Sequence, residues 1–226
     1  MENNNQKQVT FEDIENNEEI NEYITKGNEY LGVMNYTEHG FAHLKRSAVY
    51  ARRILEDLGY DERTCELAAI AGYMHDIGNV VNRVDHSQSG AVMAFRILDK
   101  LGMPAEDIAT VVTAIGNHDE GHGVPVNAIA AALILADKSD VRRTRVRNQE
   151  KSTFDIHDRV NYSVEKSVLK INEAHTLIKL KLTVDTHYSS VMDYFEIFLE
   201  RMTLCRKAAK KLGLKFQLMI NENSLM

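Results

Sequence analysis

The sequence contains only two cysteines, no apolar run long enough to span a bilayer and no excess of basic residues. Cys65 and Cys205 lie far apart, each within a helical pattern, so we expect buried thiols in a reducing compartment and no disulfide framework. A formal net charge of -6 argues against a dedicated nucleic-acid-binding protein. The first residues are acidic and rich in asparagine, unlike a signal or transit peptide. We therefore expect a cytoplasmic protein without membrane association.

The hydrophobic pattern divides the chain into a helical part and a smaller mixed part. Residues 1–10 are expected to be disordered, and Phe11–Leu31 is expected to form one or two weak helices. Further stretches between residues 43 and 137 repeat apolar residues every three or four positions, which is typical of amphipathic helices. The composition turns polar from Arg147 to about Val160, which indicates a linker. We predict a helical domain over residues 1–150 and an accessory unit over residues 151–226.

The accessory unit shows two different periodicities. Apolar and polar residues alternate over Ile178–Val184 and over Leu214–Ile220, as in half-buried strands. Between them, Val191–Leu212 carries a continuous helical stripe, and Tyr162–Ile171 is expected to be a further strand. The predicted fold is therefore mostly α, a helical bundle followed by a small C-terminal ββαβ unit.

The stretch Ala68–Asn79, AAIAGYMHDIGN, is the most informative segment. A run of small and apolar residues ends in the adjacent pair His75 and Asp76. A buried carboxylate requires a hydrogen-bonded partner or a metal, because burying it alone is costly. Other side chains of the same kind lie at the ends or on the apolar faces of predicted helices; they are His43, His86, His118 and Asp137. Imidazole and carboxylate ligands together favour iron or manganese, with zinc, cobalt, nickel or magnesium as alternatives.

The ordered pattern H…HD…H…H…D resembles the HD-domain superfamily of metal-dependent phosphohydrolases. The resemblance rests on the segments HDIGN, HSQSGA, AIGNHDE and LILADKSDVRR. It implies two divalent transition metal ions, the first held by His43, His75, Asp76 and Asp137, and the second by Asp76, His86 and His118. It also implies that a hydroxide bridging the ions attacks phosphorus. The layout is similar to that of small bacterial HD hydrolases that cleave dinucleoside tetraphosphates, although Asn79 stands where many members have lysine.

A basic cluster follows Asp137 and suits phosphate binding, because guanidinium groups bind phosphate through paired hydrogen bonds. Its members are Lys138, Arg142, Arg143, Arg145 and Arg147. We expect Lys138 and Arg143 to take part in catalysis together with Asp76. Arg83 is a weaker candidate of the same kind. Asp119 is a candidate ligand, a candidate partner of a histidine, or simply a polar residue at the C-terminus of a helix. His39 is expected in a turn at the mouth of the site. A second pair, His157 and Asp158, lies in polar sequence and is expected to have only a structural role.

These features favour a hydrolase that cleaves a phosphate ester or anhydride of a nucleotide or another small phosphorylated metabolite. Two alternatives remain open. One is a di-iron oxygenase, because some HD-fold proteins with the same ligand pattern have that activity, and the other is a non-catalytic metal-binding sensor. The strand edges of the accessory unit need to be covered, and pairing between two copies of the chain in a homo-oligomer is one way to cover them.

Overall fold

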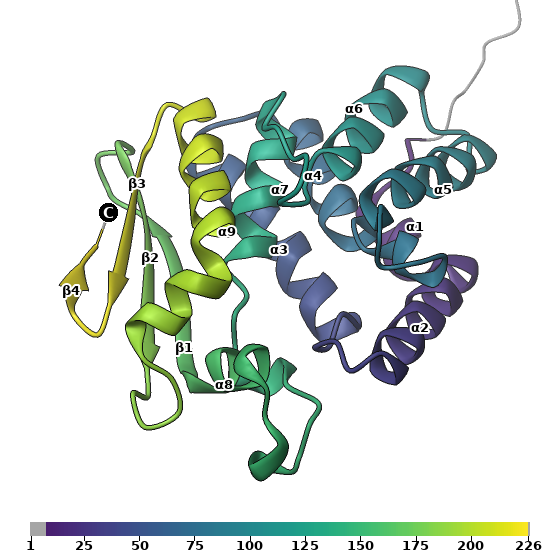
Figure 1. The fold of residues 1–226 in the computed structure, drawn as a ribbon. Coiled ribbons are helices and arrows are strands. Elements are labelled where there is room, and N and C mark those ends of the chain that lie inside the picture. The colour runs from purple at the N-terminus through teal and green to yellow at the C-terminus, as the bar shows by residue number, and fades with distance from the viewer. Residues whose placement is uncertain (1–7, 226) are drawn as a thin grey trace, which may run out of the picture.

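The computed structural model describes residues 8–225 and shows a helical bundle with a small sheet at one side (Figure 1). The bundle comprises α1 (Phe11–Glu15), α2 (Glu18–Val33), α3 (Phe41–Asp57), α4 (Glu62–Met74), η1 (Ile77–Val80), α5 (His86–Lys100), α6 (Ala105–Gly116), α7 (Ala128–Lys138) and η2 (Arg143–Arg145). The fold class is as predicted. The disorder predicted for residues 1–10 falls mostly outside the described residues, and residues 8–10 belong to no helix or strand. Within residues 8–225, no helix has the length and apolar character that crossing a membrane requires.

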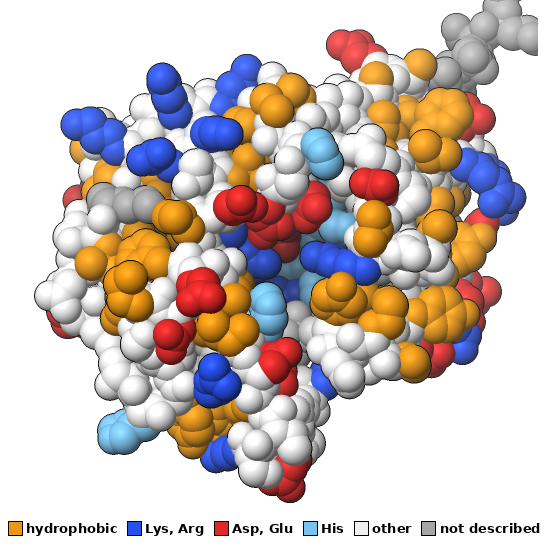
Figure 2. All heavy atoms as spheres, in the orientation of Figure 1, with side chains coloured by type: hydrophobic (Ala, Val, Ile, Leu, Met, Phe, Trp, Pro, Cys, Tyr) orange, Lys and Arg blue, Asp and Glu red, His pale blue; other side chains and the backbone are white. Residues whose placement is uncertain are grey.

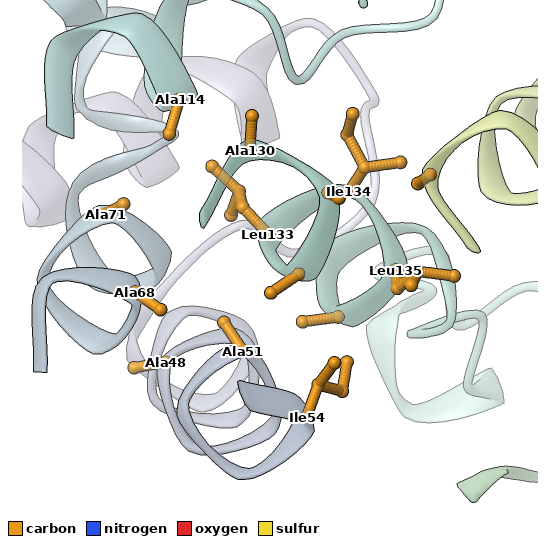
Figure 3. Packing of buried hydrophobic residues seen from close by; sticks show 14 of the residues in the cluster. Ala48, Ala51, Ile54, Ala68, Ala71, Ala114, Ala130, Leu133, Ile134 and Leu135 are labelled. Carbon is orange, nitrogen blue, oxygen red and sulfur yellow. The ribbon is translucent and has the colours of Figure 1, made fainter. Parts of the chain in front are cut away.

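Helix α7 forms the centre of the molecule. Every residue from Ile129 to Lys138 is buried, because α7 packs against α3, α4, α6 and α9 on its different sides. Small side chains at the contacts, such as Ala48 and Ala51 on α3 and Ala130 on α7, allow the helix axes to approach closely (Figure 3). A helix that is apolar on all sides is expected in the interior, where neighbouring helices cover every side. Asp137, near the end of α7, is thereby carried into the interior.

Two glycines allow backbone segments that carry candidate ligands to approach one another closely. A Cβ atom at Gly72 of α4 would lie 2.7 Å from the Cα of Ala48 on α3. A Cβ atom at Gly78 of η1 would lie 2.0 Å from the carbonyl oxygen of His86, the first residue of α5. Any larger side chain would therefore separate α3 from α4, or η1 from α5.

The C-terminal unit comprises η3 (Lys151–Thr153), α8 (Ile156–Ser163), β1 (Val164–Ile171), β2 (Leu177–Val184), α9 (Val191–Lys211), β3 (Lys215–Ile220) and β4 (Asn223–Ser224). The sheet order is β1-β2-β3-β4; β1 and β2 are antiparallel, α9 connects β2 to the parallel strand β3, and β4 adds a short antiparallel edge. The predicted ββαβ order is confirmed. One hydrophobic cluster includes buried residues of both the bundle and this unit.

One sequence prediction near the start of this unit is wrong, and another is confirmed except for its first two residues. The expected linker over residues 147–160 contains η3 and the first part of α8. The side chain of Asp155 caps α8 by accepting a hydrogen bond from the backbone N–H of Asp158 at 2.8 Å, and Val160 is fully buried. The polar composition reflects the exposed face of this short helix. The strand expected over Tyr162–Ile171 begins only at Val164, because α8 extends to Ser163.

Candidate metal centre

The residues predicted as metal ligands come together from five segments of the bundle. His43 lies in the first turn of α3, His75 caps the C-terminus of α4 and Asp76 follows it. The other ligands are His86 at the start of α5, His118 just after α6, and Asp137 in the last turn of α7. All six are buried, with at most 7% of their surface exposed.

The carboxylate of Asp76 lies between two groups of histidines. Its Oδ2 atom lies 3.3 Å from Nε2 of His75 and 3.8 Å from Nε2 of His43. Its Oδ1 atom lies 3.3 Å from Nε2 of His86, which in turn lies 3.2 Å from Nε2 of His118. Asp137 joins the first group, because its Oδ1 is 3.1 Å from Nε2 of His43. Asp76 therefore lies between the two groups of histidines, with one carboxylate oxygen facing each.

Hydrogen bonds at the opposite ring nitrogens fix how the histidines face this centre. The Nδ1 atoms of His75, His86 and His118 lie 2.9, 3.0 and 2.6 Å from the carbonyl oxygens of Gly72, Arg83 and Ile115. A carbonyl oxygen can only accept, so each Nδ1 carries a hydrogen, which leaves Nε2 as the ring atom that can bind a metal. The Nδ1 atom of His43 donates in the same way to Asp140. Such bonds orient metal-binding histidines.

The buried atoms at the centre lack the partners that their burial requires. Nε2 of His43, Nε2 of His75 and Oδ2 of Asp76 are buried without a hydrogen-bond partner. These atoms lie close together without partners, which is unfavourable unless a cation lies between them. Three groups of ligand atoms within 4.8 Å of one another could hold an ion: His43, His75 and Asp76; His75, His118 and Asp137; Asp76, His86 and His118. The donor set fits a divalent metal.

The pKa shifts show that the buried carboxylates of the centre favour positive charge next to them. Burial would lower the pKa of His75, but the carboxylates of Asp76 and Asp137 outweigh it and raise this pKa to about 10. Burial would raise the pKa of Asp137, but Lys138 and His75 hold it well below its ordinary value. The pKa of His118 is well below its ordinary value, because of burial and of the nearby cations His75 and Lys138. The centre thus retains ionised carboxylates and a neutral His118.

Asp140 contacts a candidate ligand, although the sequence pattern does not single it out. It is fully buried, and its Oδ2 atom accepts a hydrogen bond from Nδ1 of His43 at 2.9 Å. The guanidinium group of Arg142 binds the same carboxylate. The only local signal was its position three residues after Asp137, on the next turn of the chain.

The predicted basic cluster does not form a single surface. Arg142 binds Asp140, Arg145 donates to the carbonyl oxygens of Glu38 and Asp140, and Arg147 donates to those of Tyr36 and Asn28. The guanidinium carbon of Arg143 lies 4.8 Å from the ring centroid of Tyr162 and near Glu165, and Arg143 does not line the cavity described below.

Lys138 is buried, and its ammonium group lies among carboxylates. It is 2.8 Å from Asp137, 3.0 Å from Glu120 and 3.8 Å from Asp119. Direct catalytic roles for Lys138 and Arg143 stay predictions. Arg83 lies closer to the centre than the sequence suggested: its Nη1 atom is 3.6 Å from Oδ1 of Asp76.

The remaining candidates lie around the centre without joining a group of ligand atoms. Among the described residues, Asp119 and His39 are absent from every such group. His39 lies in the irregular segment before α3, with its ring centroid 5.7 Å from that of His43. Asp158 of the second HD pair accepts a hydrogen bond from Asn148 at 3.1 Å, and both residues of the pair line the cavity described below, so their purely structural role stays a prediction.

A cavity of about 920 Å³ lies beside the centre, between the bundle and the C-terminal unit. Its lining includes His39, Arg83, Glu120 and Arg145 from the bundle, and Phe195–Arg201 from α9. In Figure 2, basic and histidine side chains are visible at the floor of the central hollow, with acidic side chains at its rim. The volume is that of pockets for small-molecule ligands.

Comparison with known proteins agrees with this geometry. The family model described as "HD domain" matches residues 40–197, a range that includes all six candidate ligands. The chain is also similar to the uncharacterized protein MJ1020 of Methanocaldococcus jannaschii. The two are 26% identical over 186 residues, which is 72% of this chain and 71% of that protein.

Proposed function

Because this chain belongs to the HD domain family, whose members are mostly metal-dependent hydrolases, we propose that it hydrolyses a phosphate ester or anhydride of a small metabolite such as a nucleotide. The observation that carries the proposal is the position of Asp76. One of its oxygens faces His43 and His75, and the other faces His86. A carboxylate shared in this way suits two ions that act on one phosphoryl group.

The proposed ligands divide as follows. His43, His75, Asp76 and Asp137 would hold one ion. Asp76, His86 and His118 would hold the other. Ions bound there would polarise the phosphoryl oxygens and lower the pKa of a bound water. We propose iron or manganese, since imidazole and carboxylate ligands suit both.

The side chains around the centre contribute binding and orientation. Arg83 lines the cavity beside Asp76, and its guanidinium group is held by Oδ1 of Asn79 at 3.3 Å. We assign it to the phosphoryl group that reacts, because charge-assisted hydrogen bonds from a guanidinium fix the orientation of a phosphate. Burial of the centre strengthens these interactions, since a low local dielectric reduces screening.

The test combines metal content with turnover. Protein purified without added metal is analysed for bound metal, and then screened against nucleotides and phosphomonoesters. We expect two equivalents of metal in the wild type, near one in His86→Ala, and less than one in Asp76→Ala, because Asp76 serves both positions. Phosphate release should fall at least about 100-fold in both variants, as for loss of a catalytic metal ligand.

Asp158→Asn is the matched control for metal content, because it alters an HD pair that lies outside the ligand groups although it lines the cavity. Its metal content should equal that of the wild type. Two retained equivalents in Asp76→Ala would contradict the assignment of the bridge. Bound iron together with oxygen consumption and no phosphate release would favour the oxygenase alternative, and metal binding without turnover would favour a sensor.

A further inference from the structure

Helix α9 of the C-terminal unit forms a wall of the proposed substrate cavity. Seven consecutive residues, Phe195–Arg201, line the cavity, and α9 packs directly against α7, which carries Asp137. The sequence stripe assigned this helix only to the core of an accessory unit. The cavity therefore lies between the metal centre and α9, a helix that begins more than fifty residues after Asp137.

Arg201 is the residue of α9 that is linked to the metal centre through side-chain contacts. Its Nε atom donates to Oε1 of Glu120 at 2.7 Å, and its guanidinium carbon lies 4.6 Å from the ring centroid of Phe198. The side chain is 21% exposed. A hydrogen bond on one edge and an aromatic ring against one face hold the guanidinium group in a defined position before any ligand binds.

The charges around Arg201 alternate in sign from the centre to the cavity. Asp137 binds Lys138 at 2.8 Å, and Lys138 binds the Oε2 atom of Glu120 at 3.0 Å. Glu120 then binds Arg201 through its other oxygen. Lys138 therefore contacts carboxylates on several sides, whereas Arg201 has one carboxylate partner among residues 8–225, and its two terminal amino groups bond to no other described residue. These groups remain available to an anionic ligand.

Arg201 and Arg83 serve different parts of the cavity. Arg83 is 3.6 Å from Asp76, the bridging residue, whereas Arg201 reaches the centre only through Glu120 and Lys138. One phosphoryl group held at the centre beside Arg83 would leave Arg201 for a second anionic group of the same molecule. Guanidinium groups suit phosphate in both positions.

Resting on the proposed function, we propose that Arg201 is a specificity-determining residue that selects substrates with a second anionic group, so that phosphoanhydrides are preferred over phosphomonoesters. Glu120 and Phe198 position Arg201 for this contact. The C-terminal unit thus supplies part of the substrate site.

Binding of inorganic pyrophosphate and of orthophosphate to the full-length, metal-loaded protein tests the proposal. We expect Arg201→Gln to weaken pyrophosphate binding about 10-fold to 100-fold, since a hydrogen bond to a charged group is lost. Orthophosphate binding should change less than about threefold, because that anion would occupy the position beside Arg83. Arg201→Lys keeps the charge without the paired donors and should give an intermediate loss for pyrophosphate.

Arg206→Gln is the matched control, because Arg206 is an exposed residue of α9 that does not line the cavity. It should leave both affinities unchanged. Metal content is measured before and after titration, so that extraction of metal by pyrophosphate is detected. Equal losses for both anions in Arg201→Gln, or no loss for either, would overturn the proposal. Selective loss of pyrophosphate binding in a protein that hydrolyses no phosphate compound would support the role of Arg201 while rejecting the hydrolase function.

Discussion

Replacing Asp140 with asparagine tests whether the hydrogen bond behind His43 controls metal affinity. The carboxylate of Asp140 is fully buried and accepts the Nδ1 hydrogen of His43 at 2.9 Å. Burial would raise its pKa, but the hydrogen bonds from Arg142 and His43 hold that pKa far below its ordinary value, so Asp140 is charged at neutral pH. Asparagine keeps the shape and one acceptor oxygen but removes the charge that makes His43 a stronger donor to a metal.

The expected loss of metal affinity follows from this single contact. Loss of a partner behind a metal-binding histidine typically weakens metal affinity about 10-fold to 100-fold, or about 1.4 to 2.8 kcal/mol. A buried hydrogen bond to a charged group contributes about 1.5 to 3 kcal/mol, which agrees with that range. We expect the ion held by His43 to be weakened by this amount. The ion held by His86 and His118 should change less than about threefold, because neither residue contacts Asp140.

The assay is competition of each protein with a chromophoric chelator, monitored as the two ions are removed in turn. Arg142→Gln is the control, because it removes another partner of Asp140 while keeping the contact with His43. Melting of the metal-free proteins measures the general loss of stability that both variants share. Unchanged affinity in Asp140→Asn would refute the reasoning, as would equal weakening of both ions.

Two further predictions concern packing and cysteine reactivity. Gly78→Ala would place a Cβ atom 2.0 Å from the backbone oxygen of His86, so we expect a loss of about 1–3 kcal/mol in the free energy of unfolding, measured by urea denaturation, together with weaker metal binding. Gly116→Ala is its control, since the nearest atom would lie at an ordinary 3.6 Å; a similar loss in both would contradict the argument. Burial raises the pKa of the Cys205 thiol to about 12. Cys205 should therefore react with a thiol reagent at pH 8 only after unfolding, and stoichiometric labelling of the native protein would show that this thiol is accessible.

The six candidate ligands could be identified from the sequence because their signals are local. The apolar stripe of α6 leads directly to His118, and Asp137 ends an otherwise apolar helix. A polar residue that continues an apolar stripe must be buried, and burial requires a compensating partner. The helices and their order could be predicted for the same reason, since periodicity is a property of neighbouring residues.

The partners of these ligands could not be predicted, because their contacts join distant parts of the chain. Asp140 is 97 residues from His43, and Arg201 is 81 residues from Glu120. Arg201 occupies an ordinary polar position of a long helix, so no local pattern distinguishes it. The basic cluster illustrates the opposite problem. Arg142, Arg143 and Arg145 are neighbours in sequence, but the turn at η2 sends their side chains to different partners.

The predicted division at residue 150 stays a prediction, and the packing determines how it can be tested. Helix α9 covers one side of α7, and both helices contribute buried residues to one hydrophobic cluster, among them Leu135 and Met202. Removing residues 151–226 would expose that side of α7, and Lys138 and Glu120 would lose the helix that carries Arg201. Loss of activity in such a fragment would follow from exposure of the core alone. Point substitutions on the cavity face of α9 therefore separate the contribution of the C-terminal unit to substrate binding from its contribution to folding.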